Sequence, residues 1–115
     1  MAYNLEIERR IDSAFGTFPH TVSDKLSKKK MFGGLAYLYS GKMTVGVVGD
    51  ELMVRVVSGK MDALLRREHI RPMDFTNRPM KEFVYVSPAG FRTEAQLHDL
   101  INLGLEHARM ALRKA

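Results

Sequence analysis

The sequence predicts an α+β fold: a two-layer sandwich in which helices cover one face of a mostly antiparallel, five-stranded sheet. Two observations lead to this prediction. Five strand-like runs are joined by short turns, and helical segments lie at both ends of the chain and after the third run. A length of 115 residues suits one domain, residues 1–115, with a single core.

The first helix is expected near the N-terminus and ends at Gly16. The apolar residues before Gly16 share one helical face: Tyr3, Ile7, Ile11, Ala14 and Phe15. Between residues 17 and 30 this pattern is lost among Pro19, several serines and three consecutive lysines. We expect a basic connecting segment there, with at most one short helical turn.

Three strands are expected next, over residues 31–39, 42–48 and 51–57. The connections Ser40-Gly41 and Gly49-Asp50 are two residues long and contain Gly, which accepts the positive φ of a hairpin turn. An antiparallel meander follows from these turns.

A short second helix is expected from Ser58, whose side chain can cap it. Two further strands come from residues 71–86 and join near Thr76-Asn77. This stretch carries one tripeptide twice, Arg71-Pro72-Met73 and Arg78-Pro79-Met80. Because proline removes a backbone donor, each copy suits the start or the edge of a strand.

The last helix is expected to begin with a capping box, Thr93 to Gln96, in which the threonine hydroxyl and the glutamine side chain each bind a free backbone amide. A broad apolar stripe then indicates a long helix: Leu97, Leu100, Ile101, Gly104, Leu105, Ala108 and Leu112. The complete order is α-β(3)-α-β(2)-α.

Composition excludes several classes of protein. The chain has no cysteine, which excludes disulfides, thiolate metal sites and a thiol nucleophile. No apolar run approaches the roughly 20 residues of a membrane span, and residues 1–10 lack the pattern of a signal peptide, so we expect a cytoplasmic protein without membrane contact. The net charge of +5 permits binding to nucleic acid or to an acidic partner but specifies neither.

Several motifs resemble the N-terminal domain of the TfoX competence regulators, and the resemblance runs almost from end to end. The motifs are Lys30-Met31-Phe32-Gly33-Gly34, then Gly46 to Asp50 with Met53-Val54-Arg55-Val56, and the two Arg-Pro-Met tripeptides. Asn77 and Glu82 stand where members of this family often have Gly.

The resemblance implies the α-β(3)-α-β(2)-α fold, similar to that of secretion chaperones, and a role in assisting other transcription factors. It implies no catalytic residues. Full-length regulators also carry a C-terminal domain of helix-hairpin-helix character, which we do not expect in this chain, so competence control is not simply carried over. We therefore expect a non-enzymatic regulatory or adaptor domain that acts through protein–protein contacts, in transcription or competence-type regulation.

The residues themselves offer no catalytic constellation. The serines fit caps, loops and turns, and no nucleophile-elbow motif is present. Gly33-Gly34 and the Gly46–Gly49 segment match no phosphate-binding loop and fit close packing or a bulge better. We expect no cofactor and no metal, because four histidines match no ligand spacing: His20, His69, His98 and His107.

Three arginines in the recognisable motifs support an alternative function. Arg55, Arg71 and Arg78, near Asp50 and Asp74, could line a pocket for a small anionic ligand. They could equally form ion pairs across the sheet.

Four lysines support another alternative, an accessory nucleic-acid binder. Lys25, Lys28, Lys29 and Lys30 of the connecting segment could hold phosphates, and a solvated loop explains them as well. Neither aromatic platforms nor a recognition helix accompany them, so nucleic acid is not the favoured partner.

The uncovered face of the sheet suggests self-association. We expect it to carry apolar residues such as Met53 and Val57, or Val84 and Val86, with Leu103 and Met110 on the last helix as a competing contact surface. Because monomers rarely leave large apolar patches in water, the sequence predicts a homodimer, alongside a protein partner of unknown identity.

Overall fold

The computed structural model describes residues 3–31, 33–75 and 78–114, and the side chains of all of these except 75, 78–80 and 114. The helices are α1 (Leu5–Gly16), α2 (His20–Ser23), α3 (Ser58–Leu65), the 3₁₀ helix η1 (Pro88–Phe91) and α4 (Glu94–Lys114). The strands are β1 (Leu26–Met31), β2 (Gly34–Tyr39), β3 (Lys42–Val48), β4 (Glu51–Arg55), β5 (Ile70–Phe75) and β6 (Arg78–Val86). Within these ranges no helix combines the length and the apolar composition needed to cross a bilayer.

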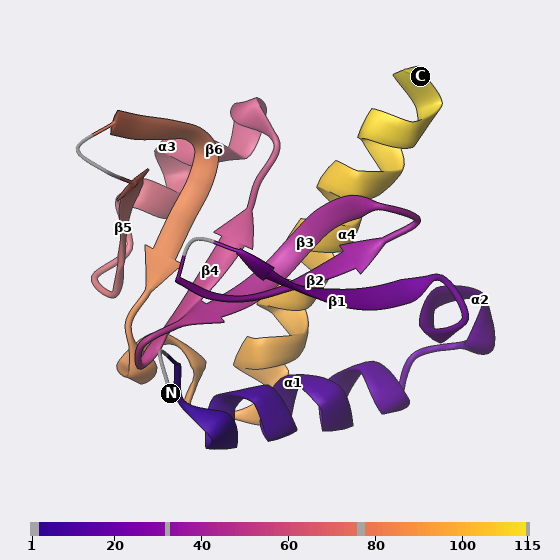
Figure 1. Cartoon of the computed structure of the whole chain (residues 1–115). Coiled ribbons are helices and arrows are strands. Elements are labelled where there is room, and N and C mark those ends of the chain that lie inside the picture. The colour runs from indigo at the N-terminus through magenta and orange to yellow at the C-terminus, as the bar shows by residue number, and fades with distance from the viewer. Residues whose placement is uncertain (1–2, 32, 76–77, 115) are drawn as a thin grey trace.

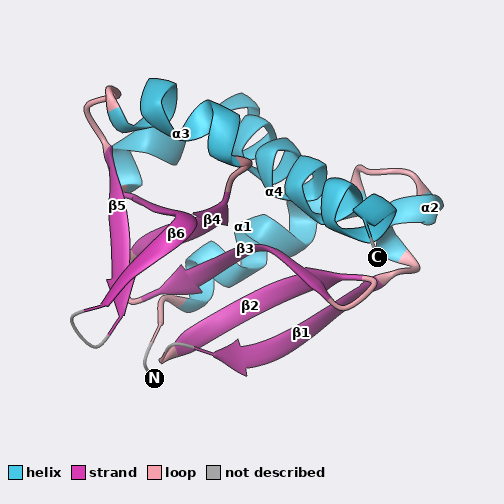
Figure 2. Ribbon diagram, turned by 90° about the horizontal axis from the view of Figure 1, so that it is seen from above, coloured by secondary structure: helices cyan, strands magenta, loops and turns pink. Residues whose placement is uncertain are grey.

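The strands form one antiparallel sheet in the order β1-β2-β3-β4-β6-β5, and helices α1 and α4 pack on one of its faces (Figures 1 and 2). This arrangement confirms the predicted α+β class. The predicted number of five strands is wrong, because the sheet has six.

Strand β1 is the additional strand, and it lies in the segment that the sequence predicts to be a loop. It pairs with β2 from Leu26↔Tyr39 to Met31↔Gly34. Its four middle residues are exposed, so the strand lacks the apolar alternation by which a strand is recognised in a sequence. It is also an outer strand, where lysines disfavour pairing with the strand of another chain. The short helical turn expected before it is confirmed as α2.

The predicted hairpin turns are confirmed by their backbone angles. Ser40 and Gly41, between β2 and β3, have φ of 50° and 82°, and Gly49, between β3 and β4, has φ of 58°. Both Arg-Pro-Met copies also lie where expected, since β5 is an outer strand and Arg78 is the first residue of β6. The turn expected at Thr76-Asn77 falls outside the described residues.

The main core lies between the sheet and helices α1 and α4. The predicted faces of both helices are buried in it, with the exception of Leu112 and Tyr3, which are partly buried. From the strands it takes alternate residues, including Leu52, Val54, Val84 and Val86. The last two therefore lie on the covered face of the sheet, and the expectation that they lie on the uncovered face is wrong.

Gly104 allows α4 to approach strand β3 unusually closely. A Cβ atom at this position would lie 2.5 Å from the carbonyl oxygen of Thr44 and 2.9 Å from its Cα. Thr44 is itself fully buried, and its hydroxyl donates a hydrogen bond of 2.8 Å to the carbonyl of Tyr37. The backbone of β3 is thus held in place, and the glycine sets the distance between helix and sheet.

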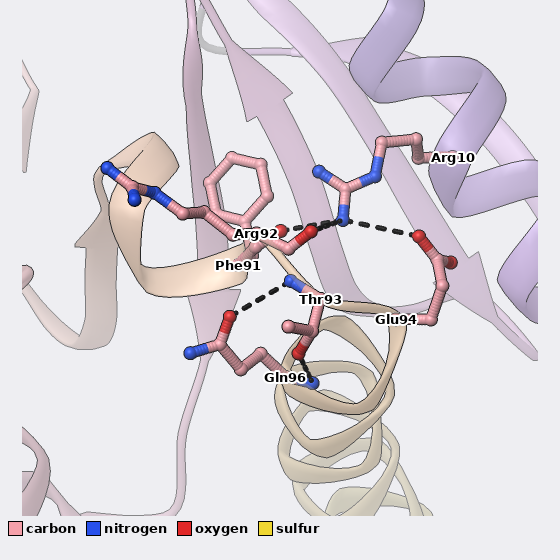
Figure 3. A network of polar contacts seen from close by, with 6 residues as sticks. All are labelled: Arg10, Phe91, Arg92, Thr93, Glu94 and Gln96. Atoms are coloured by element: carbon pink, nitrogen blue, oxygen red, sulfur yellow. Dashed lines mark hydrogen bonds and ion pairs between the residues drawn. The ribbon is translucent and has the colours of Figure 1, made fainter.

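The predicted capping box at the start of α4 is confirmed (Figure 3). The amide of Gln96 donates to the Thr93 hydroxyl at 3.1 Å, and the Thr93 amide donates to the Gln96 side chain at 3.0 Å. Arg10 of α1 reaches the same turn and donates to the carbonyl of Phe91 at 2.6 Å, with Glu94 at 3.4 Å. These contacts fasten the start of α4 to α1.

A second, smaller core lies on the face of the sheet that the helices leave uncovered. Five buried residues form it: Ala36, Met43, Met53, Met73 and Phe83. No described helix contributes to it. The β5 end of the sheet runs at a steep angle to the β1 end, so the sheet curls (Figures 1 and 2). We attribute the burial of these side chains to this curl of the sheet around its own open face. Register shifts within β2–β3 and β5–β6 accompany this curl.

Candidate functional site

A large cleft lies on the helix side of the sheet, between the start of α3 and the C-terminal half of α4, and is called the helix-side cleft below. It encloses about 670 Å³. Its lining comes from the start of α3, from β6 and from α4: Val57, Ser58, Gly59, Lys60, Glu82, Glu106, His107, Met110 and Ala111. Lys60 and Glu106 form an ion pair of 2.7 Å across it.

Glu82 is the centre of a polar network in this cleft. Its carboxylate accepts a hydrogen bond of 2.9 Å from the Ser58 hydroxyl, and its other oxygen lies 3.4 Å from Nε2 of His107. The Nδ1 atom of His107 is buried, and no group in the described part of the chain forms a hydrogen bond with it. Ser58 is the first residue of α3 and the N-cap is Val57, so the expectation that the Ser58 side chain caps this helix is wrong.

The order of these three groups does not provide an activated nucleophile. In serine hydrolases the imidazole lies between hydroxyl and carboxylate and takes the hydroxyl proton. Here the carboxylate of Glu82 lies between Ser58 and His107. The network therefore joins α3, β6 and α4, and offers no base to Ser58 other than a carboxylate.

The backbone of Glu82 has a φ of 65°, the left-handed region that favours glycine. This angle explains why glycine suits the position in related sequences. The carbonyl of Glu82 accepts a hydrogen bond of 2.8 Å from the amide of Val56, so the unusual conformation is tied to the end of β4.

The ionised form of Glu82 should stabilise the fold. The Ser58 hydrogen bond and the contact with His107 outweigh burial and lower the pKa of Glu82 below its ordinary value of 4.5. A folded-state pKa below the unfolded value gives stability that is present above pH 4.5 and is lost as the pH falls through the folded pKa. We expect urea unfolding to show Glu82→Gln less stable than the wild type at pH 7, by an amount that shrinks on acidification below pH 4.5. A difference independent of pH would contradict this role for the charge.

The four lysines proposed for nucleic acid do not form one surface. In the β1–β2 register, Lys28 and Lys30 lie opposite Tyr37 and Leu35, which belong to the helix-side core, whereas Lys29 lies opposite Ala36 of the open-face core. The edge strand thus presents its lysines on both faces of the sheet.

Two of these lysines already have partners. Lys28 contacts Glu8 at 3.0 Å and Asp12 at 2.9 Å. Burial lowers the pKa of Lys28, but the hydrogen bonds and charges of these two carboxylates together outweigh it and raise the pKa. Lys25 lies 5.8 Å from the ring centre of Tyr39. Lys28 therefore joins β1 to α1.

The three arginines proposed for an anion pocket are also separated. Arg71 forms a bidentate ion pair with Glu51, one contact of which measures 2.6 Å, and stacks over Tyr85 at 4.7 Å. The side chain of Arg78 lies outside the described part of the chain. For Arg71 the ion-pair alternative is therefore confirmed, although the partner is Glu51 and neither Asp50 nor Asp74.

Arg55 has a different environment. Its guanidinium lies over the ring of Phe83, 5.0 Å from the ring centre, and its Nε atom is buried without a hydrogen-bond partner. It lines a second cleft, called the open-face cleft below, which encloses about 480 Å³ on the uncovered side of the sheet. The lining is basic and apolar: Lys29, Met31, Leu38, Gly41, Lys42, Met43, Arg55 and Phe83.

The proposed interface residues are divided among three places. Met53 is fully buried in the open-face core, so the expectation that it forms an exposed patch is wrong. Leu103 is partly buried against the main core. Val57 and Met110 line the helix-side cleft, and Met110, at 37% exposure, is one of two large apolar side chains exposed among the described residues.

Two groups in the clefts could not be singled out from the sequence. The Glu82–His107 contact joins residues far apart in the chain, and Lys42, the first residue of β3, belongs to no motif. The only signal for Glu82 is its place at a position where glycine is frequent. Within the described ranges, no three histidine, aspartate or glutamate side chains are grouped so that they could hold a metal ion.

Comparison with known proteins identifies one family. The model of the TfoX N-terminal domain matches residues 21–108, which is most of the chain. No curated protein and no solved structure matches the chain.

Proposed function

We propose, because this chain belongs to the TfoX N-terminal domain family, that it is a non-enzymatic regulatory or adaptor domain that acts through contacts with another protein. Family membership is the observation that carries the proposal. The pairing of polar groups supports it, since Ser58 and His107 of the helix-side cleft are both engaged with Glu82. The regulated process is of the transcription or competence type.

The helix-side cleft offers the contact surface for this partner. Met110 and Val57 provide apolar area there, and the Lys60–Glu106 pair provides charge at the same cleft. An apolar centre with polar groups beside it is the usual composition of a protein interface.

Affinity capture from an extract of the source cell tests this function. The wild-type domain should retain a specific protein, and Met110→Glu should lose it. Leu5→Glu should still retain it, because Leu5 lies on α1 and is the other large apolar side chain exposed among the described residues. Circular dichroism shows whether both variants are folded. Equal retention by all three proteins, or turnover of a metabolite by the purified chain, would contradict the adaptor function.

The same surface is proposed to join two copies of the chain. The uncovered face of the sheet is not free for a dimer contact, because the curled sheet buries its apolar residues. We therefore propose that Met110 and Val57 form the contact between the two copies instead. We expect light scattering at micromolar concentration to give twice the chain mass of 13.1 kDa, and Met110→Glu to give a single chain mass. A wild-type protein with only the 13.1 kDa species would contradict the dimer.

A further inference from the structure

The open-face cleft combines cationic side chains with an apolar floor. Lys29 and Arg55 contribute the charge on this face of the sheet, and none of the residues that line the cleft is acidic. Met31, Leu38, Met43 and Phe83 contribute the apolar surface, and all four belong to or pack against the open-face core. A volume of about 480 Å³ is within the usual range for small-molecule sites.

Neither Lys29 nor Arg55 forms an ion pair with a described residue. The carboxylate of Glu82 feels the charge of Arg55, but its hydrogen bond comes from Ser58 and its other contact is His107. Two like charges without an ion-pair partner at one cleft attract an anion and disfavour a cation.

Arg55 differs from Arg71 in one respect that bears on binding. Both guanidinium carbons lie over an aromatic ring, 5.0 Å from the ring centre of Phe83 and 4.7 Å from that of Tyr85. Glu51 engages the donors of Arg71, whereas Nε of Arg55 has no acceptor among the described residues. Arg55 forms no ion pair with a described carboxylate, so its guanidinium can pair with an anion in the cleft.

We propose that the open-face cleft binds a small organic acid with an apolar or aromatic body, whose carboxylate is held by Arg55 with Lys29. The planar guanidinium donates two parallel hydrogen bonds to a carboxylate and is preset by the ring of Phe83. The body of the ligand lies against Met31 and Met43, whose flexible side chains adapt to ligands of different shape. This site is independent of the partner surface in the helix-side cleft.

Naphthylacetate, added to the full chain with isotope-labelled methionine methyl groups, tests the proposal by NMR. The methyl resonances of Met31 and Met43 should shift and saturate, while those of Met61 and Met110, on the helix side, stay in place. The uncharged amide, naphthylacetamide, and inorganic phosphate should each bind far more weakly, because one lacks the charge and the other the apolar body.

Arginine variants supply the matched control. Arg55→Gln should lower the affinity for naphthylacetate at least about tenfold, which corresponds to the loss of one charge-assisted hydrogen bond. Arg71→Gln should leave this affinity unchanged. If Arg55→Gln does not fold, Lys29→Gln, which changes an exposed side chain, should still weaken binding severalfold.

Several results would overturn the proposal. They are equal binding of the amide or of phosphate, shifts at Met110 instead of Met31, and equal losses in Arg71→Gln and Arg55→Gln. Tighter binding of a capped peptide with one aspartate between two leucines, abolished when asparagine replaces the aspartate, would assign the cleft to a partner protein. Failure here would leave the proposed partner contact at Met110 standing, since that contact is measured by affinity capture.

Discussion

Replacing Gly104 with alanine is expected to destabilise the domain by about 1–3 kcal/mol, the usual cost of forcing a methyl group into a packed core. The substitution would be favourable on helix propensity alone, by about 1 kcal/mol. Propensity is outweighed because the new Cβ would lie 2.5 Å from the Thr44 carbonyl oxygen and 2.7 Å from its carbon. These are backbone atoms of β3, which cannot rotate away as a side chain would. Urea unfolding at neutral pH measures the loss.

Gly59 in α3 provides the matched control, because no atom lies within 4 Å of a Cβ built at that position. Gly59→Ala should therefore be neutral or stabilise the domain by up to about 1 kcal/mol. The same substitution in two helices is expected to have opposite signs. If Gly104→Ala also stabilised the protein, α4 would have to lie farther from β3 than the structure places it.

Much of the fold could be predicted because its elements leave local signals in the sequence. The stripe of α4 and the Thr93–Gln96 capping box are local patterns, and both are confirmed. Strand β1 left no such signal, since its exposed lysines have low strand propensity and the strand depends on pairing with β2. The curl of the sheet is likewise a tertiary property. The alternation of side chains in β4 therefore predicted that Met53 lies on the face without helices, but not that it is buried on that face.

The candidate sites were less predictable than the fold. Arg55 and Arg71 belong to similar motifs, but only the three-dimensional structure places Glu51 beside one of them and not the other. The lysines of β1 form one cluster in the sequence and point to opposite faces once they lie in a strand, because side chains alternate along it. A charge pattern read without the correct secondary structure therefore grouped residues that the fold separates.

Met53→Ala is expected to destabilise the domain by about 2–5 kcal/mol, the range for truncating a buried methionine. Met53 has no exposed surface and packs with Met43, Met73 and Phe83 on the open face of the sheet. Its neighbour across the β3–β4 pair is Gly46, where a Cβ would lie 2.4 Å from the Met53 methyl group. Gly46 thus leaves the space that Met53 fills. When Met53 is truncated to alanine, Gly46 has no side chain that could fill the cavity. Urea unfolding measures the loss.

The control is Leu5→Ala, which truncates a large apolar side chain that is 42% exposed on α1 and lies outside the proposed partner and dimer surface. A surface change of this kind should alter the free energy of unfolding by about 0.5 kcal/mol or less. Because Met53 is buried within one chain, its loss of stability should be the same at every protein concentration. A residue that stabilised the fold only by contacting a second copy would instead show a loss that depends on concentration. A loss for Met53→Ala that changed with concentration would therefore move this residue from the core of the curled sheet to an interface.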